Sequence, residues 1–79
     1  MMSSKDALSQ FKKGLYRHYK GNDYKVLDLV KHSETEEWMV LYQACYGEGF
    51  SWVRPISLFF DNAVNSAGQT VPRFLFISD

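Results

Sequence analysis

Hydrophobic and polar positions alternate most clearly between Glu37 and Tyr46, and this segment is the centre of the predicted fold. From Trp38 onwards it is rich in β-branched and aromatic residues, which is typical of a β-strand. Similar segments with a period of two lie before and after it, at 15–19, 24–31, 50–54 and 71–77. The pattern therefore predicts four or five strands. In 24–31, strict alternation places Leu29 on the opposite face from Tyr24 and Val26.

The residues between these segments have the chemistry of turns. Glycine, asparagine, aspartate and serine gather at 20–23, 47–49 and 65–69, as tight reversals require. Pro55 ends one strand and favours a helical turn over 56–60. Pro72 indicates an edge or a bulge near the start of the last strand. We therefore expect a mainly β fold, either a small curled antiparallel sheet or a partly open SH3-like barrel of four or five strands.

A short helix is predicted before the first strand. Ser3 or Ser4 is a suitable N-cap, Leu8 and Phe11 fall on one face, and Gly14 ends the helix. So short a helix is marginal by itself, so its apolar face has to dock on the sheet.

Length and composition define a single domain. The chain has 79 residues, of which 46% are hydrophobic and 16% aromatic. Aromatic side chains bury a large area each, so a few of them supply most of a small core, and this excludes disorder for the body of the chain. We expect residues 1–13 to form an N-terminal helical extension and residues 14–79 a single β domain.

Charge and cysteine content limit the classes of function. The net charge is zero, which argues against binding nucleic acid through charge alone. Residues 1–31 carry seven Lys or Arg and three Asp or Glu, whereas residues 32–79 carry two and six. The single cysteine, Cys45, cannot form an internal disulfide, which favours a reducing, cytoplasmic compartment. No apolar run approaches the length of a membrane span, so no membrane association is expected.

Four segments and a closing motif resemble a known family when they are taken together. They are Tyr16-Arg17-His18-Tyr19-Lys20-Gly21, His32-Ser33-Glu34-Thr35, Tyr42-Gln43-Ala44-Cys45-Tyr46-Gly47 and Trp52-Val53-Arg54-Pro55, followed by Val71-Pro72-Arg73-Phe74. In this order they resemble the bacterial family called domain of unknown function 1653 (DUF1653), from about Gly14 to Ile77. The resemblance implies a small mainly β domain of bacteria, and it brings no established activity.

His18 and His32 are the only imidazoles, and they are candidates for acid–base chemistry or metal binding. Cys45 and Glu34 are the only candidates for further metal ligands, and neither lies at a spacing typical of a metal site. We therefore expect no metal and no cofactor. Around His32, the Ser33-Glu34-Thr35 run places a hydroxyl beside a base and a carboxylate. Such residues more often bind backbone groups in a turn, and this interpretation is favoured.

Arg54 and Arg73 are the only basic residues after Lys31. If they share a face with Tyr42 and Trp52, they form an aromatic and cationic surface suited to a planar anion. The alternative is an internal salt bridge to one of three carboxylates, Glu34, Glu36 or Asp61. Gln43, on the opposite strand face, either contacts a ligand or holds a loop backbone, and the loop is slightly favoured.

The favoured function is non-catalytic recognition of a nucleic acid or a nucleotide-like molecule. Its candidate ligand-binding residues are His18, His32, Glu34, Tyr42, Gln43, Trp52, Arg54 and Arg73. One alternative is a protein–protein interaction module that uses an exposed strand edge or the Phe59-Phe60 segment. The other is a small hydrolase or transferase that uses His18 or His32 with Glu34. The oligomeric state stays open.

Overall fold

A computed structural model of the chain describes residues 4–79. About half of these residues are in strands, and the two helices are short. The elements, in chain order, are α1 (Ser4–Gln10), β1 (Gly14–His18), β2 (Asp23–Lys31), β3 (Trp38–Ala44), β4 (Ser51–Pro55), α2 (Ile56–Phe59), β5 (Asn62–Val64), β6 (Thr70–Pro72) and β7 (Phe74–Ser78).

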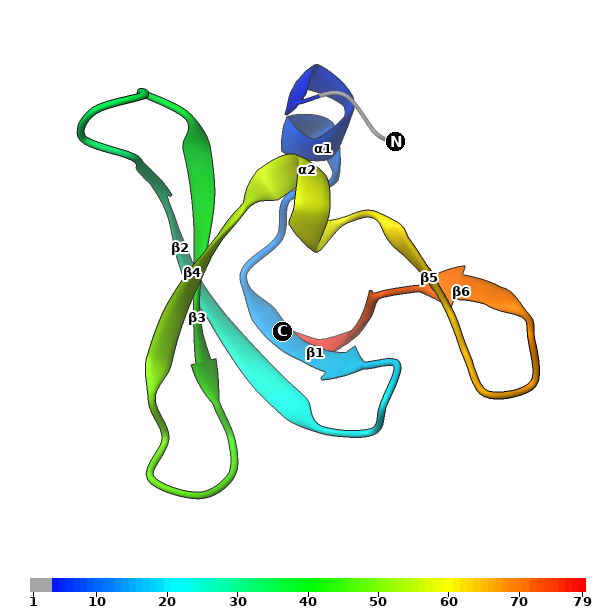
Figure 1. The fold of residues 1–79 in the computed structure, drawn as a ribbon. Helices are drawn as coiled ribbons and strands as arrows, with labels where there is room; N and C mark the ends of the chain where they lie inside the picture. The colour runs from blue at the N-terminus through cyan, green and yellow to red at the C-terminus, as the bar shows by residue number, and fades with distance from the viewer. Residues whose placement is uncertain (1–3) are drawn as a thin grey trace.

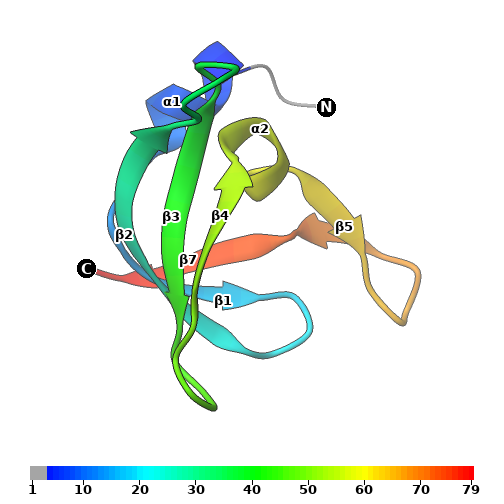
Figure 2. The ribbon, with the colours of Figure 1, turned by 60° about the vertical axis from the view of Figure 1, so that its left-hand side comes forward.

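Five of the strands form one antiparallel sheet in the order β4-β3-β2-β1-β7, and β5 pairs with β6 in a separate two-stranded sheet. The β5–β6 hairpin projects away from the main sheet (Figure 1). Figure 2 shows the curl of the main sheet: β2, β3 and β4 run together, while β1 and β7 cross below them. No pairing joins β4 to β7 among the described strands, so the sheet stays open. The fold is thus the predicted curled antiparallel sheet.

The hydrophobic core lies on the inner face of this curl. Helix α2 supplies Ile56 and Phe59, which are 1% and 0% exposed. The ring of Phe59 stacks on that of Phe74 with 4.1 Å between centroids and 3° between planes. Helix α1 adds Ala7, which is fully buried. The remaining buried members of this cluster are Tyr16, Val26 and Val40.

A bulge in β2 corrects the predicted face assignment. Strand β2 pairs Val26 with Tyr42, but then Asp28 with Leu41 and Leu29 with Val40, so the register shifts between Val26 and Asp28. One extra residue in a strand reverses the alternation beyond it. Leu29 therefore lies on the same face as Val26, and strict alternation was wrong on this point.

The predicted strand over 71–77 is two strands. Residue Arg73 separates β6 from β7, and only β7 joins the main sheet. This break agrees with the irregularity that Pro72 indicates. Near the N-terminus, α1 ends at Gln10, before the predicted stop at Gly14. The predicted cap at Ser3 lies outside the described residues.

Candidate ligand-binding site

The register of β3 and β4 brings three of the predicted site residues to one face of the sheet. Tyr42 lies opposite Trp52, and Val40 lies opposite Arg54. Residues directly opposite each other in an antiparallel pair point to the same side. Because Val40 is a fully buried core residue, Tyr42, Trp52 and Arg54 all project from the inner face.

Tyr42 belongs to a group of aromatic rings that continues the core towards this edge. Its ring makes edge-to-face contacts with Tyr24, Phe59 and Phe74 at centroid distances of 5.4, 5.3 and 5.6 Å. Trp52, on the edge strand β4, is 51% exposed. The inner face therefore changes from packed rings at Tyr42 to an accessible indole at Trp52.

The guanidinium of Arg54 has no carboxylate partner among residues 4–79. Its Nε donates to the carbonyl of Leu58 at 3.0 Å, and neither described ion pair includes it. Arg54 acts electrostatically on its neighbours, because its charge lowers the pKa of His18 and opposes the rise that burial causes in the pKa of Tyr42. The contact with Leu58 engages Nε, and none of the described hydrogen bonds or ion pairs of residues 4–79 engages the two terminal nitrogens of Arg54.

Arg73 forms an internal salt bridge with Asp61, which is the alternative to a role in binding a ligand. Its Nε lies 2.6 Å from Oδ1 of Asp61, and its Nη2 donates to Oδ2 at 3.3 Å. The guanidinium also lies 6.0 Å from the centre of the Tyr19 ring. The fork of Arg73 is therefore already occupied by a carboxylate, which offsets its positive charge.

His18 lies among these groups at the end of β1. Its ring is 4.9 Å from that of Phe74 and 4.7 Å from that of Tyr19. Nδ1 accepts a hydrogen bond from the Lys20 amide at 3.2 Å, which places the proton of the neutral ring on Nε2. Burial lowers the pKa of His18, and the positive charges of Arg73, Lys20 and Arg54 lower it further.

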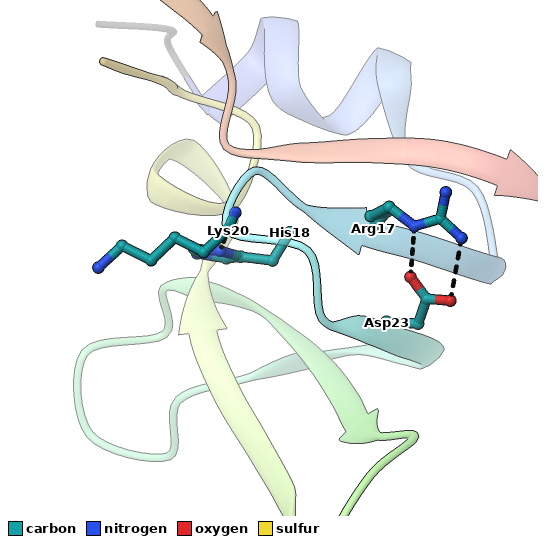
Figure 3. Close-up of polar contacts among 4 residues, drawn as sticks. All are labelled: Arg17, His18, Lys20 and Asp23. Atoms are coloured by element: carbon teal, nitrogen blue, oxygen red, sulfur yellow. Dashed lines mark hydrogen bonds and ion pairs between the residues drawn. The ribbon is translucent and has the colours of Figure 1, made fainter. Parts of the chain in front are cut away.

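Arg17, the residue before His18 in β1, lies on the other face of the sheet. Figure 3 shows Arg17 bound to Asp23 by two contacts, while His18 and Lys20 lie beside the turn between β1 and β2. The Arg17 Nε to Asp23 Oδ1 distance is 2.8 Å. Because adjacent residues in a strand alternate in direction, this ion pair is separated from His18.

Tyr24 and Tyr46 form a hydroxyl pair at the end of the same aromatic group. Their oxygens are 2.6 Å apart. Burial, the bond to Tyr46 and the nearby phenols raise the pKa of Tyr24 to about 12. The hydroxyl group of Tyr24 therefore stays protonated at neutral pH, where it donates or accepts hydrogen bonds without charge.

Three predicted site residues lie elsewhere. His32 is in the β2–β3 turn, where its Nδ1 accepts from the amides of Glu34 and Thr35 at 3.1 and 3.3 Å. This confirms the turn interpretation of that segment. His18, at the end of β1, lies near the start of β2, whereas His32 follows the end of β2. Gln43 donates to the carbonyl of Gly49 at 3.0 Å, so the loop interpretation of its amide is also confirmed.

The site also contains aromatic residues that the sequence pattern did not predict there. Tyr19, Tyr24 and Phe74 surround His18, and Phe50 contacts Trp52. Phe50 could have been found from the sequence, because it alternates with Trp52 and Arg54. Phe74 could not, because β7 meets β1 only through pairing between distant parts of the chain. We call His18, Tyr42, Trp52, Arg54 and Arg73 together the arginine–aromatic surface.

Within residues 4–79, no three His, Cys, Asp or Glu side chains gather in a way that could hold a metal ion. Neither described helix has the length and apolar character needed to cross a membrane.

The fold and this set of side chains define a small mainly β protein with an arginine- and aromatic-rich surface at one edge of an open sheet. The chain belongs to the DUF1653 family of proteins of unknown function, whose model matches residues 14–76. It is similar to a crystal structure of a DUF1653 protein from Bordetella bronchiseptica, with 32% identity, a TM-score of 0.79, and coverage of 87% of this chain and 90% of that one. The resemblance predicted from the sequence is thereby confirmed. No curated protein matches the chain.

Proposed function

We propose that this protein is a non-catalytic binding module that recognises a nucleotide-like ligand or a single-stranded nucleic acid through the arginine–aromatic surface. The observation that carries the proposal is Arg54. This cation has no carboxylate partner among the described residues, and it projects from the same face as Tyr42 and the half-exposed Trp52. A guanidinium binds phosphate through paired, charge-assisted hydrogen bonds, and an exposed indole offers a base a stacking surface.

The charge around the surface supports an anionic ligand although the chain is neutral overall. Burial lowers the pKa of His18 most, and Arg73, Lys20 and Arg54 each lie close enough to the imidazole for their charges to lower it further. Asp61 neutralises one of these cations. The local field is therefore positive, and it needs no large net charge because stacking supplies part of the affinity.

The geometry favours recognition over acid–base catalysis. A hydrolase of the kind considered above needs an imidazole within hydrogen-bond reach of a carboxylate. The ring of His18 accepts a bond from the Lys20 amide, and the ring of His32 accepts bonds from turn amides. The polar contacts of the two rings in residues 4–79 are thus those of structural or ligand-facing groups.

The test is a titration followed by amide chemical shifts. Uridine and adenosine monophosphates, single-stranded RNA and single-stranded DNA are added in turn to the labelled protein. We expect shifts centred on His18, Trp52 and Arg54. Arg54→Gln is expected to weaken binding roughly tenfold or more, because a charge-assisted contact contributes about 1.5–3 kcal/mol.

Arg17→Gln is the matched control, because it removes the same charge from the other face of the sheet. It is expected to change binding far less than Arg54→Gln. Equal losses in the two variants would mean that only net charge matters, and an absence of shifts at Trp52 and Arg54 would overturn the proposed function.

A second candidate function is pairing of the exposed β4 edge with an extended protein segment. The amide of Ala44 donates to the carbonyl of Phe50 at 3.0 Å, so alternation directs the backbone groups of Ser51 and Val53 towards the free edge. Val53 is also 55% exposed. Val53→Pro would remove an edge donor without breaking the β3–β4 ladder. Loss of self-association or partner capture in this variant, with nucleotide binding retained, would separate the two functions.

A further inference from the structure

Strand β4 and the residue before it present a row of three side chains on one face. Residues Phe50, Trp52 and Arg54 occupy alternate positions, and the ring contact between Phe50 and Trp52 agrees with a shared direction. Phe50 is 60% exposed and Trp52 is 51% exposed. Two large aromatic side chains therefore stand accessible beside the guanidinium of Arg54, which has no carboxylate partner within residues 4–79.

The two rings are separate stacking surfaces. Their centroids are 6.2 Å apart and their planes are inclined at 73°. A single planar base cannot lie parallel to both rings at this inclination. Stacking on both rings therefore requires two bases that can rotate relative to each other. Successive bases of a single strand can do so, whereas the stacked bases of a duplex are held parallel.

Charge along the row has a direction. Arg54 stands at the end nearest α2, while Glu48 lies at the other end, in the exposed turn between β3 and β4. A phosphate is favoured at the Arg54 end, with the bases extending towards Phe50. This arrangement is complementary to a short strand that follows the edge of the sheet.

We propose that the ligand is a single-stranded oligonucleotide of at least two nucleotides, with one base on Trp52, the adjacent base on Phe50 and a phosphate at Arg54. This inference rests on the proposed function and narrows it, because a mononucleotide fills only one of the two stacking surfaces. RNA and DNA share this chemistry, since bases and phosphates carry it.

The experiment compares ligands that differ in the number of bases. Uridine monophosphate, uridine diphosphate, the dinucleotide UpUp and its deoxythymidine counterpart are titrated by calorimetry at one salt concentration. The dinucleotide is expected to bind at least about fivefold more tightly than the monophosphate, as a second stacked base predicts. Uridine diphosphate adds phosphate without a second base, so it should gain much less.

Two variants test the assignment of the second base. Phe50→Ala should bring the ratio of dinucleotide to mononucleotide affinity close to one. Val53→Ala, on the opposite face of the same strand, should leave that ratio unchanged. Both side chains are more than half exposed, so both variants should fold, and their thermal unfolding verifies this.

The outcomes separate the two proposals. A dinucleotide preference that depends on Phe50, in RNA or in DNA form, supports the inference, and a difference between the two forms measures the contribution of the 2′-hydroxyl. Equal affinity for one and two bases, or an equal gain with uridine diphosphate, overturns the inference and leaves the proposed function intact. Failure of every nucleotide to bind overturns both.

Discussion

Arg73 is held to Asp61 by two contacts between guanidinium and carboxylate, the shorter being 2.6 Å from Nε to Oδ1. The backbone amide of Arg73 also donates to the carbonyl of Asp61 at 3.0 Å. The pair thus joins the segment that follows α2 to the junction between β6 and β7. It braces the base of the β5–β6 hairpin, and of the three arginines only Arg54 has no carboxylate partner within residues 4–79.

Asp61→Asn should lower the free energy of unfolding by about 1 kcal/mol, since the pair is partly buried and solvent screens part of the attraction. Urea denaturation measures the loss. Asp23→Asn is the matched control, because Asp23 pairs with the more exposed Arg17, and it should have the smaller effect. A larger loss for Asp23→Asn would show that the Arg73 pair does not brace the hairpin.

Stability should depend on pH through His18. Burial first, and then the charges of Arg73, Lys20 and Arg54, hold its native pKa below the usual 6.5. Between the native pKa and 6.5 the unfolded chain binds more protons than the folded one, so the free energy of unfolding falls as the pH falls. The contribution of His18 to the free energy of unfolding is fully present above pH 6.5 and is lost as the pH falls from 6.5 through the native pKa.

Urea unfolding between pH 7.5 and 5 measures this slope, and the imidazole signals in NMR spectra give the native pKa directly. His18→Gln should flatten the slope in this range. A native pKa above 6.5 would mean that the ring does not lie among the three cations.

Tyr46→Phe should lower the pKa of Tyr24 from about 12 while leaving it above 10.0. The variant removes the bond to Tyr46 and its charge, whereas burial, the largest cause of the shift, remains. The carbon signals of the tyrosine rings report the titration in NMR spectra. In the unchanged protein the raised pKa costs stability between pH 10 and 12, because the unfolded phenol loses its proton first.

Tyr19→Phe is the control for this titration, since no hydrogen bond joins the hydroxyl of Tyr19 to Tyr24. It should leave the pKa of Tyr24 where it is. A pKa for Tyr24 that did not respond to Tyr46→Phe would mean that burial alone raises it.

Much of the fold follows from local pattern. The alternation around Trp38–Ala44 and the glycines at 47–49 specify a strand and a reversal from neighbouring residues alone. The bulge between Val26 and Asp28 cannot be predicted from local pattern, because it depends on the register of β2 against β3. Pro72 indicates an irregularity close to the break between β6 and β7, but the division of these strands between two sheets follows from their pairing with β5 and β1.

The candidate site, like the fold, can be predicted only in part from local pattern. Alternation correctly predicts that Trp52 and Arg54 share a face, and that Tyr42 can join them. Which arginine pairs with a carboxylate depends on where the chain places Asp61, and local pattern left that open. The role of His32 in its turn was correctly favoured, because a polar residue beside serine, glutamate and threonine has turn amides within reach.

Gly14 should be the glycine least tolerant of a side chain. It has a φ of +138°, and a Cβ there would collide with the carbonyl oxygen of Ser78 and lie 3.2 Å from Cε1 of Phe76. Gly14→Ala therefore combines an unfavourable backbone conformation with a clash against the end of β7. We expect it to lower the free energy of unfolding by about 2–3 kcal/mol.

The variant Gly21→Ala separates the cost of the backbone conformation from the cost of the clash. Its φ is +107°, and nothing lies within 4 Å of a Cβ built there, so Gly21→Ala carries the backbone term alone, about 1–2 kcal/mol. Urea denaturation of the two variants measures the difference. Hydrogen exchange should also show faster exchange in β7 for Gly14→Ala alone, because the clash forces that strand away from β1. Equal losses of stability in the two variants, with β7 still protected from exchange, would contradict this prediction. They would mean that the end of β7 does not pack against Gly14. The pairing of β1 with β7, which brings Phe74 to His18, would then end before Ser78.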